Sequence, residues 1–385
     1  MWNSAAATWV KTAAESVPSA PTERRDRFGI YNWGTRPSPT GSQSGDYLNW
    51  SASFVASRSA RTIRIELGFD QCGDYGQDPT DYYHPEYLKL IAQSPQYHRL
   101  FSDSRFNTYL LTTYTLNGYN HVWDMGYSES AAELEKEQIR RLGGYLISAF
   151  PSKTFILMNW EEDHVTSSNY PGYIAYTQAR ADAVREVRGT GGKLYYGMEC
   201  ACMFGDCGIL NFVAPKVNVD YLSYSSWQST TMNPNGVQAG DNAAAIKERL
   251  MAHLQNLLNK ANGVGTATPR PGFYQPRNII VGEFGFPRVQ WCPHALSPGQ
   301  SCESYRVDPT QWLEGIVGAV ETFGASYAIY WQILDNRDPG CDFMNGRSPY
   351  TSYAPDYGLL DFVNVGSLWL VWPTDIGRAW GALMK

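Results

Sequence analysis

The chain has no long hydrophobic run. Nowhere do 18 or more apolar residues follow one another, so the sequence predicts no membrane-spanning helix. It also lacks any run of five or more basic residues, and 31 Lys and Arg against 37 Asp and Glu leave a net charge of −6. This balance argues against nucleic acid as a partner. The first 25 residues lack the continuous apolar core of a signal peptide. We expect a secreted protein because of its cysteines, described below, and its signal is then absent from this sequence.

Several motifs that would indicate other chemistries are missing. No GxGxxG follows the first predicted strand, and the chain has neither the GxSxG of α/β-hydrolases nor the GxxxxGK[ST] of phosphate-binding loops. It has no HExxH and no paired CxxC spacing, which argues against a zinc site. These absences argue against dinucleotide, nucleotide and zinc enzymes, and we expect no cofactor.

The seven cysteines occur mainly in segments that read as loops. Cys292 and Cys302 bracket a polar stretch of nine residues, and we predict a disulfide between them. A Cys202–Cys207 bridge is a second prediction. Cysteines in loops suit an oxidising compartment, which is consistent with secretion. The odd count leaves at least one cysteine unpaired or paired between chains.

Aromatic residues are abundant, with 13 Trp and 26 Tyr in a chain that is 43% hydrophobic. This apolar content is enough for a substantial core. Flat aromatic faces also bury the C–H faces of sugar rings at low conformational cost, so some of these side chains are candidates for sugar binding. The alternative is that they simply fill a large core.

Short apolar runs alternate with amphipathic helical patterns along the chain. The predicted strands are rich in Val, Ile and aromatic residues: 28–34, 61–67, 106–114, 155–161, 194–199, 219–224, 279–283 and 327–331. Predicted helices lie between them at 128–149, 173–187, 243–261 and 309–323, the last with an N-cap at Asp308 followed by Pro309.

Eight strands interleaved with helices predict an α/β protein with a (β/α)8 barrel fold, and a doubly wound open sheet is the alternative. We predict one domain over residues 1–385, with an N-terminal extension at 1–25 and a C-terminal closing segment at 337–385. The closing segment contains the apolar run 367–372 and is expected to pack on the barrel as a helix or a lid. Long irregular loops at 68–105 and 287–306 follow the second and seventh strands and are expected to shape a cleft.

Two carboxylates stand where predicted strands end. Glu161 ends the fourth strand and Glu283 ends the seventh. If the apolar residues that alternate with them line the barrel, both carboxylates point into its mouth, where barrel enzymes carry out their chemistry. Two carboxylates on separate strands are what glycoside hydrolysis requires. The other interpretation is that either one is a salt-bridged rim residue, with Glu162 or Asp163 as the working group in place of Glu161.

The segment Gly282-Glu283-Phe284-Gly285 resembles the strand-seven nucleophile motif of clan A glycoside hydrolases, retaining (β/α)8 enzymes such as the family 5 cellulases and mannanases. The resemblance implies that Glu283 is the nucleophile and Glu161 the acid/base. It also implies that Arg64 lies near the nucleophile, that Tyr224 contacts it, and that Trp331 floors the sugar site. One departure is clear: the clan usually has Asn directly before the acid/base, whereas here Trp160 holds that place and Asn159 lies one residue earlier.

The remaining candidates surround this pair. We expect Arg64 to keep the pKa of Glu283 low, and the apolar ring of Trp160 to favour the protonated form of Glu161. Glu199 and Glu66 are further mouth carboxylates, which can orient substrate or pair with arginine. The predicted substrate-binding residues are Trp33, Arg64, Asn159, Trp160, Glu199, Tyr224, Trp227 and Trp331.

These patterns predict a retaining glycoside hydrolase that cleaves a β-linked polysaccharide or oligosaccharide internally, as a monomer. A carbohydrate-binding barrel without activity is one alternative. Another is a metal-dependent barrel hydrolase that uses Glu66, Glu199, Asp163 and His164. The absence of an HxH pair on the first strand argues against the metal-dependent enzyme.

Overall fold

The structure is a computed structural model of the 385-residue chain. The residues that it describes are 17–32, 47–67, 84–113, 129–164, 169–205, 207–231, 235–238, 240–286, 307–331, 360–365, 368–373 and 375–384.

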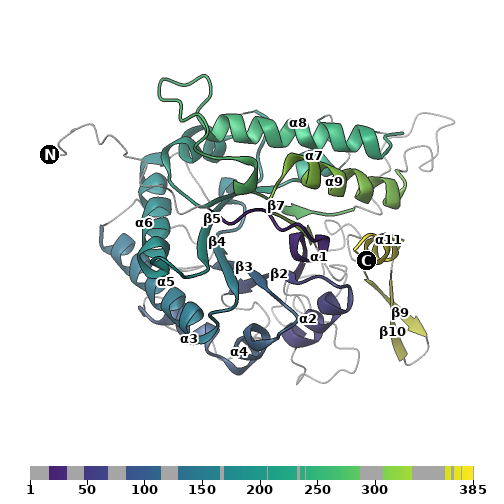
Figure 1. Ribbon diagram of the computed structural model, residues 1–385, viewed down its shortest axis with the longest axis horizontal. Helices are drawn as coiled ribbons and strands as arrows, with labels where there is room; N and C mark the ends of the chain where they lie inside the picture. The colour runs from purple at the N-terminus through teal and green to yellow at the C-terminus, as the bar shows by residue number, and fades with distance from the viewer. Residues whose placement is uncertain are drawn as a thin grey trace, which may run out of the picture.

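Eight parallel strands close into a barrel in sequence order, as Figure 1 shows. The (β/α)8 fold predicted from the sequence is therefore confirmed. The strands are β1 (Phe28–Asn32), β2 (Thr62–Leu67), β3 (Thr108–Thr113), β4 (Thr154–Met158), β5 (Leu194–Cys200), β6 (Tyr221–Ser225), β7 (Ile279–Phe284) and β8 (Tyr327–Trp331).

Pairing of the first strand with the last closes the barrel and fixes the register of the strands around it. Tyr31 on β1 lies opposite Arg64 on β2 and opposite Trp331 on β8. Because all eight strands run the same way, their carboxyl ends meet at one face of the barrel, which is its mouth.

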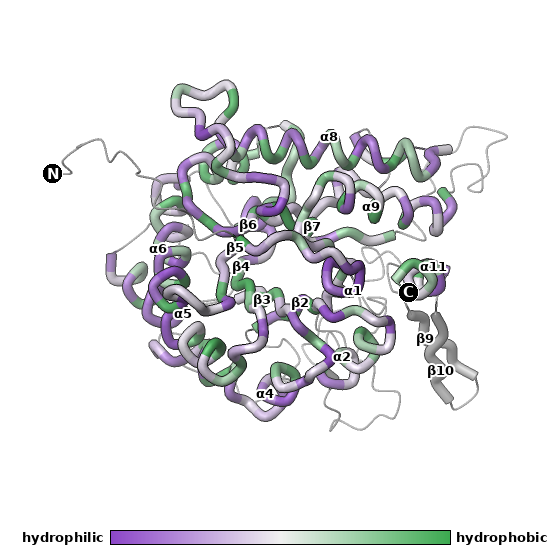
Figure 2. The backbone as a smooth tube through the Cα atoms, in the orientation of Figure 1, coloured by the Kyte–Doolittle hydropathy of each residue, from purple (hydrophilic) through white to green (hydrophobic). Residues whose placement is uncertain are grey.

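Helices surround the barrel, and the longer ones are amphipathic, so α5 and α8 alternate between hydrophilic and hydrophobic residues along their length (Figure 2). None of the helices in the described ranges is long and apolar enough to cross a membrane. The α-helices are α1 (Arg24–Arg27), α2 (Tyr47–Ser57), α3 (Tyr87–Ala92), α4 (Pro95–Ser102), α5 (Glu129–Ala149), α6 (Tyr170–Arg188), α7 (Trp227–Thr230), α8 (Ala243–Ala261), α9 (Pro309–Phe323) and α11 (Asp375–Leu383). Short 3-10 or π turns are η1 (Glu162–His164), η2 (Ile209–Val213), η3 (Ala214–Lys216) and η4 (Pro276–Asn278).

Local chemistry explains where the helices begin and end. The Asp308 carboxylate accepts hydrogen bonds from the backbone of Thr310 and Gln311, both at 2.9 Å, and Pro309 occupies the first turn of α9. The same helix ends at Gly324, whose φ of 86° suits glycine. The N-cap predicted at Asp308 is therefore confirmed.

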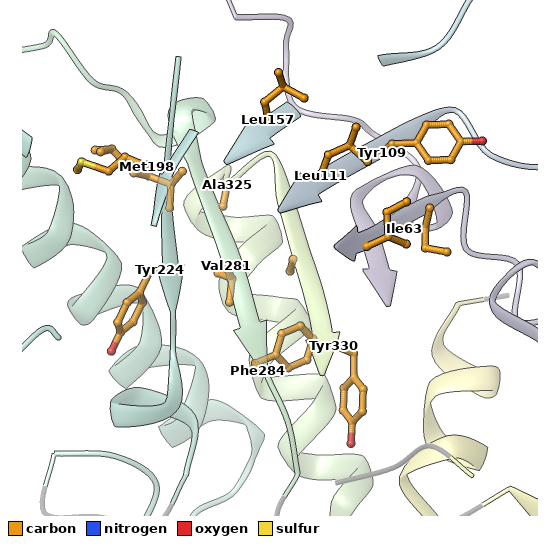
Figure 3. Close-up of a cluster of buried hydrophobic side chains, with 14 of the residues drawn as sticks. Ile63, Tyr109, Leu111, Leu157, Met198, Tyr224, Val281, Phe284, Ala325 and Tyr330 are labelled. Atoms are coloured by element: carbon orange, nitrogen blue, oxygen red, sulfur yellow. The ribbon is translucent and has the colours of Figure 1, made fainter. Parts of the chain in front are cut away.

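The core has two layers, one inside the barrel and one between the barrel and the helices. The interior layer contains Val17, Tyr31, Leu110, Ile156, Met158, Tyr221, Ile280, Tyr327 and Ile329. Residues of the outer layer are drawn in Figure 3, among them Leu157, Tyr224, Val281, Phe284 and Tyr330. Phe284 and Tyr330 lie side by side there, with ring centroids 5.5 Å apart.

This division overturns one prediction about side-chain direction. We expected Phe155 and Leu157 on β4, and Ile279 and Val281 on β7, to line the barrel, but all four lie in the outer layer. Strands of a barrel are buried on both faces, so apolar residues do not mark the inner face. The two candidate carboxylates reach the mouth by a different route, described below.

Two predicted loop segments also differ. Part of the stretch 68–105 is regular, because α3 and α4 lie within it, whereas 287–306 lies outside the described residues. In the C-terminal segment the apolar run is a strand, β10 (Leu368–Pro373), paired antiparallel with β9 (Leu360–Val365). The hairpin stands beside α11 at the edge of the barrel (Figure 1). The closing helix is α11, whose buried Trp380 contacts the rings of Phe284 and Tyr330.

The described part of the predicted N-terminal extension belongs to the barrel. Val17 packs inside it, and the backbone N–H of Arg61 donates to the carbonyl of Arg25 at 2.7 Å.

Candidate active site

Glu161 and Glu283 come together at the mouth of the barrel, joined by the hydroxyl of Ser225. The Ser225 Oγ lies 2.5 Å from Glu161 Oε1 and 3.3 Å from Glu283 Oε2. These two carboxylate oxygens are therefore within about 6 Å of each other, the most that the two distances allow. Both side chains are buried, 6% and 2% exposed. Ser225 was not predicted from the sequence.

A β-bulge turns Glu283 into the mouth. Val281 on β7 pairs with Ala328 on β8, and Phe284 pairs with Tyr330. Two residues separate the first pair from the second on β7 but only one does on β8, so β7 carries one extra residue. Without it, Glu283 would continue the outward-facing series of Ile279 and Val281. Bulges at barrel rims re-aim side chains in this way. The bulge places Glu283 opposite Ser225 on β6.

Glu161 reaches the same place from a loop. The strand β4 ends at Met158, three residues earlier than predicted, and Glu161 has a φ of 31°. This left-handed backbone is unusual for a residue with a side chain, and it is found most often where function requires it. The backbone N–H of Glu161 donates to Glu199 Oε1 at 3.3 Å, which holds the turn.

The glycines of the Gly282–Gly285 segment make room for their neighbours. A Cβ atom on Gly282 would lie 2.0 Å from Glu199 Oε2 and 2.1 Å from Ser223 Oγ. One on Gly285 would lie 2.8 Å from the ring of Trp227. The glycines thus allow a carboxylate to pack under Glu283 and an indole to pack beside it.

Arg64 lies beneath the pair, as predicted. Its guanidinium makes two hydrogen bonds to Glu199, at 2.7 and 2.8 Å, and its Nη1 is 3.4 Å from Glu283 Oε1. The ring of Tyr31 lies against it, with the guanidinium carbon 4.4 Å from the ring centroid. Arg64 is therefore shared between two carboxylates, and Glu199 has the closer contacts.

The pKa of Glu283 differs from the expectation, and the main cause is burial. Burial raises the pKa of Glu283 well above its usual value, and the charges of Glu161 and Glu199 raise it further, against the opposing effects of Arg64 and of the Trp227 indole N–H. The expectation of a low pKa for Glu283 is therefore wrong, because burial outweighs the lowering effect of Arg64.

Two tryptophans form one wall of the site. The indole N–H of Trp227 donates to Glu283 Oε2 at 3.2 Å. Trp227 and Trp331 meet edge to face, with ring centroids 5.4 Å apart, and both are partly exposed. An indole beside a carboxylate can support a sugar ring at the reacting carbon.

Two other predicted residues, Tyr224 and Asn159, lie away from the mouth. The ring of Tyr224 is in the outer layer and its hydroxyl contacts Ser229, so β6 presents Ser225 to the mouth instead (Figure 3). The Asn159 amide oxygen accepts from Arg180 of α6 at 2.5 Å, on the helix side of β4. Trp160 is partly exposed between Asn159 and Glu161. Trp33 lies outside the described residues.

Alternation along the strands would have found the missed residues. On β6, Tyr221 faces the interior and Leu222 the outer layer, so Ser223 and Ser225 face inward. The same reasoning places Tyr31 inside on β1. Its hydroxyl contacts Glu66 at 3.3 Å and Thr112 at 3.5 Å.

The carboxylates proposed for a metal site have other partners. Asp163 Oδ2 accepts from the backbone of Ala201 and Cys202, at 2.7 and 3.0 Å, and Glu199 is paired with Arg64. Across the residues whose placement is described, no three His, Cys, Asp or Glu side chains are grouped as metal ligands. The side chain of His164 is not among them.

One predicted disulfide is present and the other cannot be placed. Cys202 and Cys207 are joined, with an S–S distance of 2.06 Å, and Cys200 is a buried free thiol. Cys292 and Cys302 lie outside the described residues.

Comparison with solved structures finds barrels of glycoside hydrolases. A xyloglucan-specific β-1,4-glucanase of family 5, from a ruminal metagenomic library, matches at 12% identity over 90% of this chain and 88% of its own, with a TM-score of 0.50. The virulence factor SghA of Agrobacterium tumefaciens matches at 11% identity over 97% and 98%, with a TM-score of 0.51. A glucosidase from Croceicoccus marinus matches at 13% identity over 89% of this chain but only 66% of its own, with a TM-score of 0.47. No family model and no curated protein matches the sequence.

At such low identity these likenesses establish the fold. The fold neighbours include family 5 enzymes, so the resemblance to clan A barrels seen around Glu283 is confirmed for the architecture.

Proposed function

We propose that this chain is a retaining glycoside hydrolase that cleaves a β-linked polysaccharide or oligosaccharide internally, by double displacement. The observation that carries the proposal is the Ser225 bridge, which holds oxygens of Glu161 and Glu283 within about 6 Å of each other. Carboxyl groups about 5 to 5.5 Å apart suit a retaining mechanism and about 6.5 to 9.5 Å an inverting one. The close approach therefore supports a working carboxylate pair, and the retaining assignment rests on the motif resemblance around Glu283.

The surroundings of the pair support a role for each carboxylate. Glu283 has Arg64 on one oxygen and the Trp227 indole N–H on the other, partners that stabilise a carboxylate anion and orient it as a nucleophile. In the first step Glu283 attacks the anomeric carbon while Glu161 gives its proton to the leaving oxygen. In the second step Glu161 takes a proton from water, and the resulting hydroxide displaces Glu283 from the sugar.

The substrate class is proposed from similarity to known enzymes and not from a contact in the site. The β linkage and internal cleavage rest on the motif resemblance and on the named activity of one fold neighbour, the xyloglucan-specific β-1,4-glucanase. We also propose that the enzyme is secreted, works as a monomer of one domain and needs no cofactor. The Cys202–Cys207 disulfide supports an oxidising compartment.

Hydrolysis of a panel of purified polysaccharides, with sizing of the products, tests the activity and the internal cleavage. Proton NMR of the first product formed tests the mechanism, and we expect the β-anomer before mutarotation. An α-anomer would mean an inverting enzyme. Binding without hydrolysis would favour the carbohydrate-binding alternative, and loss of activity on chelation would favour the metal-dependent one.

A further inference from the structure

Glu199 is a fully buried carboxylate beneath the site. It is the second-last residue of β5, faces the barrel interior and has no exposed surface. Arg64 donates two hydrogen bonds to it, at 2.7 and 2.8 Å. The hydroxyl of Ser223 donates a third at 2.7 Å, and the backbone N–H of Glu161 a fourth at 3.3 Å.

These contacts leave Glu199 no capacity to bind a sugar. A carboxylate has about four acceptor positions, and four donors of the protein already occupy them. Its buried position also keeps it from the open mouth. The expectation that Glu199 binds substrate therefore does not fit its surroundings.

The same contacts tie Glu199 to both candidate catalytic carboxylates. On one side it fixes the backbone of Glu161, where φ is 31°. On the other it holds Arg64, which also donates to the carbonyl of Gly282 at 3.0 Å and lies 3.4 Å from Glu283. The missing side chain of Gly282 provides the space that Glu199 fills.

We propose that Glu199 is a positioning residue, which holds Arg64 and the Glu161 turn beneath the two carboxylates without touching the sugar. This inference rests on the proposed function. A buried ion pair that is tied to both halves of a site fixes geometry more than it adds stability.

Removal of the Glu199 charge has a predictable electrostatic effect. The charged or titratable groups around Glu199 and Glu283 are Arg64 from β2, Tyr31 from β1, Glu161 and Glu162 after β4, and Cys200 on β5. In Glu199→Gln the Arg64 charge is no longer balanced by Glu199, so it acts on Glu283 more strongly. The pKa of Glu283 then falls, and the acidic limb of the pH–activity profile moves to lower pH.

The test compares Glu199→Gln with the wild-type enzyme. We expect kcat at neutral pH to fall about tenfold or more, KM to stay within about threefold, and the acidic limb to move down by about one pH unit. A rise in KM with unchanged kcat would show that Glu199 binds sugar and would overturn the proposal. So would an unshifted profile.

Asp220→Asn is the matched control. Asp220 is also nearly buried and paired with an arginine, Arg188, at 3.0 Å, but it precedes β6 at the opposite end of the barrel from Ser225. We expect this variant to lose stability while the pH profile stays in place. An equal shift of the acidic limb in both variants would mean that the shift reflects a general loss of stability and not the role of Glu199.

Two further measurements keep the inference testable if the first variant is unstable or the enzyme has another substrate. Ser223→Ala removes one donor to Glu199 and keeps the charge of Glu199, and we expect a lower kcat with unchanged KM. A change in KM alone would count against the proposal.

Carbon-13 NMR titration of labelled glutamate carboxyls measures the pKa of Glu283 without a substrate, with the Glu283 signal assigned from its loss in Glu283→Gln. If no glycoside is cleaved the proposed function fails, but a lower Glu283 pKa in Glu199→Gln would still support the role of Glu199, and an unchanged pKa would refute it.

Discussion

At the scale of single residues, the site depends on one hydroxyl between two carboxylates. Ser225 is close to both Glu161 and Glu283, while Arg64 lies 3.4 Å from Glu283 Oε1 and the Trp227 indole N–H donates to Glu283 Oε2. The two carboxylates therefore have different surroundings, and different surroundings give two like groups different roles.

The two truncations should fail in different ways. Glu283→Ala should lower kcat on every substrate by about 10⁴-fold or more, because no covalent intermediate can form. Glu161→Ala should keep much of its first step on an aryl glycoside with a good leaving group, and added azide should restore turnover with a β-glycosyl azide as product. Kinetics with and without azide measure both effects. Full activity of Glu161→Ala on polysaccharide would contradict the acid/base assignment, and Glu162 would be the next candidate.

Ser225→Ala should weaken catalysis more than binding. A hydrogen bond to a charged group contributes about 1.5 to 3 kcal/mol, so kcat should fall about tenfold or more while KM changes little. Steady-state kinetics on one soluble substrate measure the split. Ser229→Ala is the control, because that buried serine contacts Tyr224 and His253 and neither carboxylate. Equal losses in the two variants would remove the special role of Ser225.

At the scale of elements, the loop after β5 braces both sides of the site. The backbone of Cys202 donates to Asp163, next to the Glu161 turn, and that of Met203 donates to Gln228, which follows Trp227 on α7. The Cys202–Cys207 disulfide closes this loop. The brace is thus separate from the strands that carry the reactive groups.

Removal of the disulfide should therefore lower the stability of the fold more than it lowers the rate of catalysis. In the chain-entropy model a bridge that closes a loop this short contributes about 2 kcal/mol, so Cys202→Ser/Cys207→Ser should lower the free energy of unfolding by about that amount. We expect kcat at 25 °C to fall by less than about tenfold, because Glu283 and Ser225 remain on their strands. Denaturant unfolding and kinetics on the same preparation measure both. A kcat loss as large as that of Glu161→Ala would show that the loop sets the geometry of the pair.

At the scale of the whole molecule, buried carboxylates couple the fold to pH. Burial raises the pKa of Glu162 to about 8, against the opposing effects of Tyr173 and Arg180, and the charge of Glu199 raises it too. Burial also raises the pKa of Glu283. The unfolded chain loses these protons near pH 4.5, whereas the folded chain keeps them to higher pH. The stability that they contribute is present below about pH 4.5 and is lost as the pH rises towards 8.

We therefore expect Tm to fall between pH 5 and pH 8, and to fall less in Glu162→Gln. A neutral amide has no proton to lose, so this variant should be more stable than the wild type at pH 8 and similar to it at pH 4.5. Thermal unfolding over this pH range measures the difference. Glycosidase activity on the same samples provides a second check, because Glu162→Gln should stay active if Glu161 is the acid/base. An unchanged slope of Tm with pH would contradict the origin assigned to it.

The sequence by itself determined the architecture. Eight apolar runs separated by helical patterns and caps such as Asp308 favoured the (β/α)8 barrel over an open sheet, and helices α8 and α9 begin and end where the pattern predicts. It also determined that two glutamates at strand ends would meet at one face, because parallel strands place those ends together. Arg64 and the glycines around Glu283 were found through the resemblance to clan A glycoside hydrolases.

Only the tertiary structure decided how those glutamates face each other. Alternation along β7 points Glu283 outward, and one extra residue relative to β8 turns it back. Glu161 reaches the mouth through a left-handed turn held by Glu199, a residue 38 positions away. Bulge position, turn conformation and the division of Arg64 between two carboxylates depend on contacts between strands distant in sequence. No local pattern encodes them, because each depends on neighbours that only the closed barrel brings together.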